Sequence, residues 1–232
     1  MKNMVFALVV FLSVRVVAGE SSLLASGAEI VKQSYRGDPV VSGGVSFRDT
    51  EQSRHLLRIA ANGDREYVSA DGTLGYSNSQ THTTLTFKGQ AIPEAKRFVR
   101  LPPGGQLQPG MEWDASVVGG TSCGDMSFQY KAKSFEGTPF TLQMNGQTRS
   151  FQTIRVEYRA SVRICASPND LNPTKYWERK QVILFAPALN EIVESTTWSF
   201  NWRSSSSAND ESRFVDAAHG WRIVEIRQRQ TE

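Results

Sequence analysis

The stretch IRVEYRASVRI, residues 154–164, alternates strictly between apolar and polar side chains. Apolar residues occupy the even positions from Ile154 to Ile164, and polar residues, three of them arginines, occupy the odd positions between them. Successive side chains of a β-strand point to opposite faces of the sheet, so this period of two is typical of a strand that is buried on one face. The stretch therefore predicts a long strand with one face in a core and the other in water.

Two further stretches, 126–133 and 196–202, repeat the alternation. Their expected apolar faces are Met126, Phe128, Tyr130 and Ala132 in the first stretch, and Trp198, Phe200 and Trp202 in the second. Together with residues 154–164 they predict three long strands, each with one face in water.

Shorter apolar runs separated by turn-forming residues extend the pattern. The runs are 56–60, 66–69, 83–87, 98–101, 113–118, 140–144, 182–185 and 221–226. Between two of the runs lies Asn62-Gly63, and Asn145-Gly146 is the dipeptide favoured in two-residue hairpins. We therefore predict an all-β, mainly antiparallel fold, a single curved sheet or a half-barrel (β-clam), with at most one or two short helices, near 91–97 or 211–218.

The apolar side of such a sheet must be covered. A curved sheet of about ten strands that folds over itself leaves space for a lipid or another apolar ligand. A fully packed sandwich without a cavity satisfies the same pattern, so both alternatives stay open.

The first residues predict export. Lys2 precedes an apolar run, residues 4–14, and Val17-Ala18-Gly19 offers small residues at a cleavage point, which is typical of a secretory signal peptide. We expect a signal peptide over 1–19, a single antiparallel β domain over 20–232, a mature form without a transmembrane span, and a periplasmic or secreted location. The alternative is an uncleaved anchor helix, and since no cysteine follows the cleavage point, a lipid anchor is not expected.

The charge balance argues against nucleic acid as a partner. Removal of the signal peptide takes Lys2 and Arg15 from the 26 basic residues and leaves 24, against 23 acidic residues. A surface that binds phosphates needs an excess of basic groups. The expected partners are instead a lipid, an apolar ligand or an envelope protein, and the sequence does not define the oligomeric state.

The only two cysteines, Cys123 and Cys165, predict a disulfide, because an oxidising compartment lets one persist. Closing that loop would stabilise the fold by about 4 kcal/mol through the unfolded chain. Two free thiols are the alternative. The pair lacks the neighbouring ligands of a zinc site, and we expect neither a metal nor another cofactor.

Residues 120–124 match the G-x-S-x-G pattern of serine hydrolases around Ser122, and the chain order allows a triad with Asp210 or Asp216 and with His219. A nucleophile elbow needs a strand before the serine and a helix after it. Here the alternating stretch 126–133 follows, so the missing helix favours an ordinary turn, and we expect no catalytic residue. A serine hydrolase that uses Ser122 is kept as an alternative.

Two groups of residues are candidates for binding. Arg155, Arg159 and Arg163 form a basic face on one strand, which is either a solvated row or a dock for an acidic partner or a lipid headgroup. Trp177, Trp198, Phe200 and Trp202 offer large aromatic contact areas, which either line a ligand cavity or pack in the core.

Several phrases between residues 108 and 203 resemble those of a family of bacterial exported proteins of unknown function. The phrases are Gly110-Met111-Glu112-Trp113, residues 151–156, Tyr176-Trp177, and residues 185–189 with Ile192-Val193. The resemblance implies a curved antiparallel sheet related to the β-clam of periplasmic lipoprotein carriers. Ser150 and Asn190 stand where the family has glycines, which puts the two turns in doubt.

These observations together predict a non-catalytic binding or carrier protein of the bacterial envelope that holds a lipid or another apolar ligand on the concave face of its sheet. A structural envelope protein that contacts a partner is the remaining alternative.

Overall fold

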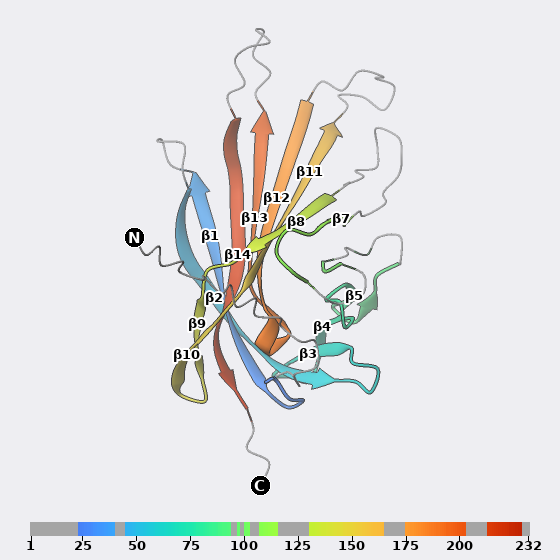
Figure 1. Cartoon of the computed structure of the whole chain (residues 1–232), viewed down its shortest axis with the longest axis vertical. Helices are drawn as coiled ribbons and strands as arrows, with labels where there is room; N and C mark the ends of the chain where they lie inside the picture. The colour runs from blue at the N-terminus through green and yellow to red at the C-terminus, as the bar shows by residue number, and fades with distance from the viewer. Residues whose placement is uncertain are drawn as a thin grey trace, which may run out of the picture.

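The computed structural model describes residues 23–39, 45–93, 97, 100–102, 107–115, 130–164, 175–202 and 213–228. At residues 39, 161–164, 175–179, 199–202 and 213–217 it describes the backbone alone. These parts of the chain form one open, curved, 14-stranded sheet that is almost entirely antiparallel (Figure 1). The all-β prediction is confirmed, since helical structure within the described residues is limited to a short 3-10 turn, η2 (Pro187–Leu189).

The strands, in chain order, are β1 (Glu29–Pro39), β2 (Val45–Ile59), β3 (Arg65–Ser69), β4 (Leu74–Asn78), β5 (Thr84–Phe87), β6 (Gln90–Ala91), β7 (Glu112–Asp114), β8 (Tyr130–Glu136), β9 (Phe140–Met144), β10 (Gln147–Phe151), β11 (Ile154–Ile164), β12 (Lys175–Ala186), β13 (Glu191–Trp202) and β14 (Arg213–Arg227). In space their order is β6-β5-β4-β3-β2-β1-β14-β13-β12-β11-β8-β7, and the β9-β10 hairpin lies off this path. The long strands run side by side along the molecule in Figure 1.

The final strand, β14, occupies the middle of the sheet. It pairs antiparallel with β1 on one side, where Glu29 lies opposite Arg227, and with β13 on the other, where Arg222 lies opposite Glu194. A short parallel contact with β9 adds to this. The N-terminal strands β1 to β6 and the later strands β7 to β13 are therefore joined into one sheet by β14.

Strand β11 has the bounds that its alternation predicts, and its core face is confirmed over the described side chains, but Glu157, expected in water, is buried. Val156, Tyr158 and Ala160 are buried, whereas Arg159, between the last two, is exposed. The hairpin predicted at Asn145-Gly146 is also present, because both residues adopt the positive φ angles, 51° and 78°, that a type I′ turn needs.

Two local expectations are wrong. Residues 213–218 belong to strand β14 rather than to a helix, because backbone pairing with β1 and β13 on both sides outweighs local helix propensity. Thr197, which the alternation of residues 196–202 places on a wet face, is buried, as are its neighbours Ser195 and Thr196, and the side chains of Ser199 and Asn201 lie outside the described residues. The Ser195 hydroxyl accepts a hydrogen bond from the Gln181 amide, and the Thr196 hydroxyl is hydrogen-bonded to the Tyr35 hydroxyl.

One face of the sheet, the covered face, carries two clusters of buried apolar side chains. Their central members are Ile30, Leu57 and Tyr67 in the first cluster, and Val156, Tyr158 and Ile183 in the second. Trp221 packs against both clusters, and Leu101 and Leu107, from the segment between β6 and β7, close the second. The opposite face, the open face, carries the side chains of Arg155, Glu157 and Val182.

Candidate functional site

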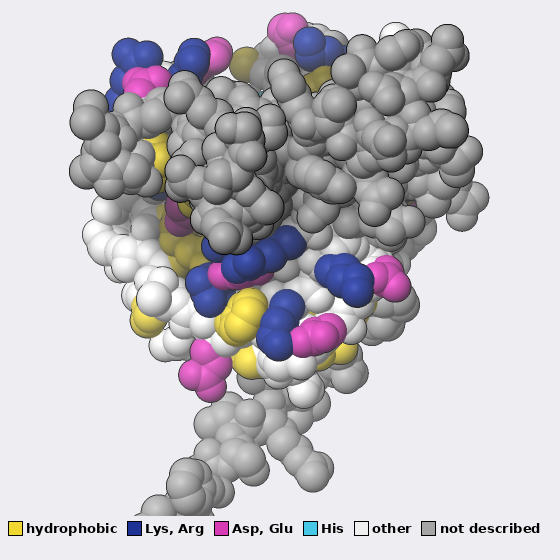
Figure 2. Space-filling view, turned by 90° about the horizontal axis from the view of Figure 1, so that it is seen from above, with side chains coloured by type: hydrophobic (Ala, Val, Ile, Leu, Met, Phe, Trp, Pro, Cys, Tyr) yellow, Lys and Arg dark blue, Asp and Glu magenta, His cyan; other side chains and the backbone are white. Residues whose placement is uncertain are grey.

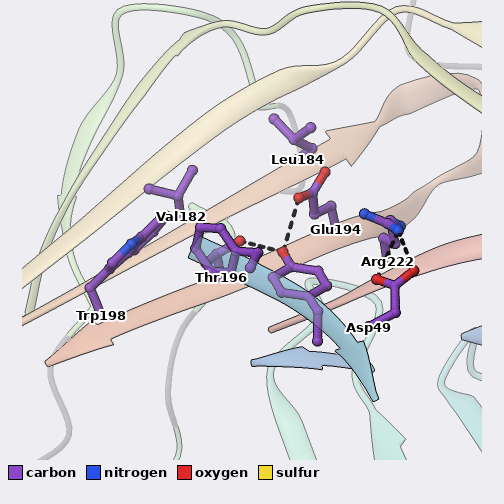
Figure 3. A pocket seen from close by; sticks show the side chains of 9 residues that line it. Asp49, Val182, Leu184, Glu194, Thr196, Trp198 and Arg222 are labelled. Atoms are coloured by element: carbon purple, nitrogen blue, oxygen red, sulfur yellow. Dashed lines mark hydrogen bonds and ion pairs between the residues drawn. The ribbon is translucent and has the colours of Figure 1, made fainter. Parts of the chain in front are cut away.

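A hollow of about 560 Å³ lies on the open face of the sheet (Figure 3). Its lining residues are Tyr35 on β1, Phe47 and Asp49 on β2, Val182 and Leu184 on β12, Glu194, Thr196 and Trp198 on β13, and Arg222 on β14. These five strands are consecutive in the sheet, so the hollow extends across its middle. The volume falls within the range of about 300–1,000 Å³ that small-molecule sites occupy.

The register of the strands explains how the floor of the hollow forms. Asp49, Tyr35, Gly220, Thr196 and Val182 lie directly opposite one another on successive strands, in that order. A Cβ atom on Gly220 would lie 2.6 Å from two carbons of the Tyr35 ring and 2.4 Å from the carbonyl oxygen of Ser195. Only glycine therefore lets the Tyr35 ring lie across β14 and reach β13.

The Tyr35 hydroxyl connects two residues of β13. It donates to a carboxylate oxygen of Glu194 at 2.9 Å and lies 2.5 Å from the hydroxyl oxygen of Thr196. Burial raises the pKa of Tyr35 above its ordinary value, so the phenol stays neutral and keeps its proton to donate. Glu194 is thereby held at a fixed place in the hollow.

A second polar pair closes another side of the hollow. The Arg222 guanidinium donates to both carboxylate oxygens of Asp49, at 2.9 and 3.0 Å, and its carbon lies 5.7 Å from the centre of the Tyr35 ring. In Figure 3 Arg222 points toward Asp49, while Glu194 lies on the side of Leu184. The hollow thus holds two carboxylates and one guanidinium, and the guanidinium is already paired.

Apolar side chains form the rest of the wall. Phe47 is 46% exposed, and its ring meets the Tyr35 ring edge to face at 5.5 Å. Gly37 makes room for it, because a Cβ there would lie 2.8 Å from the Phe47 ring. Val182, Leu184 and Trp198 line the opposite side. Apolar walls around a few fixed polar groups are the usual composition of a small-molecule site.

The predicted basic face lies next to the hollow on β11. Arg155 is opposite Leu184, and Glu157 is opposite Val182. The Glu157 carboxylate pairs with Arg155 at 3.0 Å, with Arg159 at 3.3 Å and with Lys180 at 3.5 Å. Burial acts to raise the pKa of Glu157, but these cations outweigh it and hold the pKa below its ordinary value.

This arrangement partly neutralises the arginine row. Seen from above, the described side chains in Figure 2 mix basic, acidic and hydrophobic types. Docking of an acidic partner on Arg155 and Arg159 stays a prediction, and the Arg163 side chain lies outside the described part of the chain.

The structure brings one of the four predicted aromatic residues to the hollow. Trp198 lines it and lies on the same face as Lys180, whose ammonium is 5.7 Å from the indole ring. The side chains of Trp177, Phe200 and Trp202 lie outside the described residues, and their ligand-lining role stays a prediction.

The residues of the predicted disulfide and of the alternative triad are mostly outside the described part. Cys123, Cys165, Ser122 and Asp210 belong to undescribed segments, as does the side chain of Asp216. His219 is described, and it lies exposed on β14, opposite Arg36 and Thr197. Among the described side chains, no three His, Cys, Asp or Glu groups lie together in a way that suits a metal ion.

A buried ionic cluster lies on the covered face. Glu191, 2% exposed, accepts hydrogen bonds from Arg65 at 2.9 Å and from the Tyr67 hydroxyl at 2.6 Å. Burial acts to raise the pKa of Glu191, but the neighbouring cations hold it below its ordinary value. Buried charges are costly unless they are paired and hydrogen-bonded in this way, so we assign the cluster a structural role.

Lys32 belongs to the same region. Its ammonium lies 3.8 Å from the centre of the Trp221 ring, 5.0 Å from that of Tyr67 and 5.1 Å from that of Tyr76, and it donates to the Tyr76 hydroxyl. Burial lowers the pKa of Lys32 to about 8. The cluster and the hollow share strand β14, where Trp221 faces the covered side and Arg222 the open side.

A second hollow, of about 490 Å³, lies beside β1, β2 and β3 and differs in charge from the first. Arg54, Arg58 and Arg227 line it together with the carboxylate of Glu29, which pairs with Arg54 and Arg227 at 3.6 Å each. Its basic lining does not continue into the first hollow.

Comparison of the sequence with known family models finds no match, and neither does comparison with curated proteins. The fold is similar to two solved structures. The hypothetical lipoprotein YmcC from Escherichia coli (K12) is 10% identical, with 83% of each chain covered and a TM-score of 0.39. A protein of Parabacteroides distasonis that is also described as a lipoprotein is 10% identical, with 87% of this chain and 95% of that chain covered and a TM-score of 0.34. The link to β-clam carriers stays a prediction.

In the described part of the chain there is no helix with the length and apolar character that crossing a membrane requires.

Proposed function

We propose that this chain is a non-catalytic binding protein of the bacterial envelope that holds a lipid or another apolar molecule in the hollow on the open face of its sheet. The observation that carries the proposal is the composition of the hollow: Phe47, Val182, Leu184 and Trp198 surround polar groups that are fixed by hydrogen bonds. An exposed aromatic side chain beside an unfilled space favours contact with an apolar ligand.

The hollow on the open face is a better place for a ligand than the covered face. On the covered face, buried side chains of both core clusters pack against one another, and Leu101 and Leu107 lie over the second cluster. The hollow, in contrast, opens to solvent and is bounded by strands that the packing of the core holds in place. A ligand enters it without disrupting either cluster.

Native mass spectrometry of the protein purified without detergent tests the proposal. We expect an added mass that organic extraction removes and that phospholipid or fatty acid standards identify. Phe47→Ala should abolish the added mass, because it removes part of the wall. Phe87→Ala should retain it, since Phe87 is 57% exposed on β5 and lines no part of the hollow. Equal retention by both variants would place any bound molecule elsewhere.

The proposal also holds that the protein is not an enzyme and that it is exported. A fluorophosphonate probe should leave Ser122 unlabelled, and labelling that is lost in Ser122→Ala would replace the proposal with the serine hydrolase alternative. The intact mass of protein released from the periplasm should correspond to a chain that begins near Glu20, because residues 1–19 have the character of a signal peptide. A full-length mass in the membrane fraction would contradict export by cleavage.

A further inference from the structure

The lining of the hollow contains more carboxylates than cations. Two carboxylates, Asp49 and Glu194, and one guanidinium, Arg222, line the hollow, and a single nitrogen of that guanidinium, Nη2, donates to both oxygens of Asp49. Glu194 makes no ion pair among the described side chains, and its partner there is the Tyr35 hydroxyl. The lining therefore carries a net negative charge, and the carboxylate that is not neutralised is Glu194.

The basic side chains next to the hollow share the single carboxylate of Glu157, and they lie outside the lining of the hollow. Arg155 lies opposite Leu184, and Lys180 lies opposite Trp198, but both pair with Glu157. Neither lines the hollow. An anionic head group would meet two carboxylates there and would have to displace Asp49 from its two-oxygen contact with Arg222.

The aromatic side chains of the hollow are a second argument for a cationic ligand. Tyr35, Phe47 and Trp198 line the hollow, and cations bind favourably to the faces of such rings. Arg222 and Lys180 already lie 5.7 Å from the ring centres of Tyr35 and Trp198, and Phe47, 46% exposed, is the lining ring without a cation against it among the described side chains. The chain already uses this interaction on its own cations: the Lys32 ammonium lies 3.8 Å from the Trp221 ring centre, and the Lys180 ammonium lies 5.7 Å from that of Trp198. Aromatic rings together with carboxylates are the chemistry that recognises alkylammonium and quaternary ammonium groups.

The order of the lining residues across the strands determines how an amphiphile would be oriented in the hollow. Arg222, Glu194 and Leu184 lie opposite one another on β14, β13 and β12. A cation held at Glu194 therefore has apolar surface on the β12 side, where Leu184 and Val182 continue to Trp198. We propose that the hollow binds single amphiphile molecules with an ammonium head group, the head at Glu194 and the aliphatic chain over Val182, Leu184 and Trp198.

This inference rests on the proposed function, and isothermal titration with two decyl compounds, below their micelle concentrations, separates the two. Decyltrimethylammonium carries the cation, and decyl maltoside carries a neutral head on the same chain. We expect the cation to bind about tenfold more tightly than the maltoside, which is the size of effect that one charge-assisted contact gives. Tetramethylammonium, which has the head without the chain, should bind at least tenfold more weakly than decyltrimethylammonium, because it leaves the apolar wall uncovered.

Glu194→Gln keeps the size of the side chain and removes its charge. We expect it to reduce the preference for the cation to about twofold or less while binding of the maltoside is unchanged. Glu66→Gln is the matched control, because Glu66 is a half-buried carboxylate on β3 outside the hollow, and it should keep the full preference.

The outcomes are distinct. Failure of both decyl compounds to bind overturns the proposed function and this inference together. Binding of both compounds with equal affinity, a cation preference that survives Glu194→Gln, or tetramethylammonium binding as tightly as the long-chain cation overturns the inference alone.

Discussion

Replacing Gly220 with alanine should damage both the sheet and the hollow. The new methyl carbon would lie 2.4 Å from the carbonyl oxygen of Ser195 and 2.6 Å from two carbons of the Tyr35 ring. Both distances are about 1 Å shorter than an ordinary contact. The ring can turn away, but the carbonyl oxygen belongs to the backbone of β13, which is paired on both sides.

The expected cost is the sum of two effects. Forcing one methyl group into a well-packed site costs about 1–3 kcal/mol. If the Tyr35 ring is displaced, the loss of its hydrogen bonds to Glu194 and Thr196 adds about 1 kcal/mol. Gly220→Ala should therefore lower the free energy of unfolding by about 2–4 kcal/mol, a large part of the stability of a typical domain.

Urea-induced unfolding, followed by tryptophan fluorescence, measures this cost from the shift of the midpoint. Tyr35→Phe should lose about 1 kcal/mol, because it removes the hydroxyl alone. In a Tyr35→Ala background the cost of Gly220→Ala should become smaller, since the ring no longer opposes the methyl group while the Ser195 oxygen still does. A cost below about 0.5 kcal/mol for Gly220→Ala, or an equal cost in the two backgrounds, would refute the close packing of Tyr35 on Gly220.

Three further predictions concern other parts of the fold. Glu191→Gln should reduce the free energy of unfolding by about 3–5 kcal/mol, because it leaves buried cations without their counter-charge. Glu112→Gln, which breaks an exposed pair, should leave the free energy of unfolding almost unchanged, and similar midpoints for the two variants in urea would contradict the burial of Glu191. Burial lowers the pKa of His82 from 6.5 to about 4, so the unfolded chain binds more protons between these values, and stability should be complete above pH 6.5 and fall as the pH drops toward 4. His82→Gln should flatten this part of the stability profile, and an unchanged slope would show that other groups cause it. Gly146→Ala should lower the free energy of unfolding by about 1 kcal/mol, since the φ of 78° at this position is strained for a residue with a Cβ. An unchanged midpoint of thermal unfolding in this variant would contradict the described hairpin geometry.

The alternation of β11 was sufficient to predict its bounds and its core face, but not the burial of Glu157 among three cations on the other face, because one of those cations, Lys180, lies on a neighbouring strand. Strand β1 gave no such signal. Its Lys32 and Gln33 are both buried, so polar side chains interrupt the apolar pattern. Most of β2 was also missed, since its residues from 46 to 52 are exposed and no face of that part is apolar.

The hollow was predictable only in part. Trp198 stood out as a large aromatic residue in an alternating strand, but Tyr35, Glu194 and Arg222 did not. These three meet because β14 lies between β1 and β13, and Tyr35 and Glu194 are 159 positions apart in the chain. Spacing along the sequence does not reveal which strands are neighbours, so it does not reveal a site that depends on them.

The central place of β14 has a consequence for biosynthesis. A ribosome makes this strand after both of its neighbours, and until it emerges β1 and β13 each present a row of backbone groups with no strand to bind. A nascent or C-terminally shortened chain is therefore held in an incomplete state, open to chaperones and proteases, however well its earlier hairpins have formed. The emergence of β14 is therefore the step that unites the two halves of the sheet.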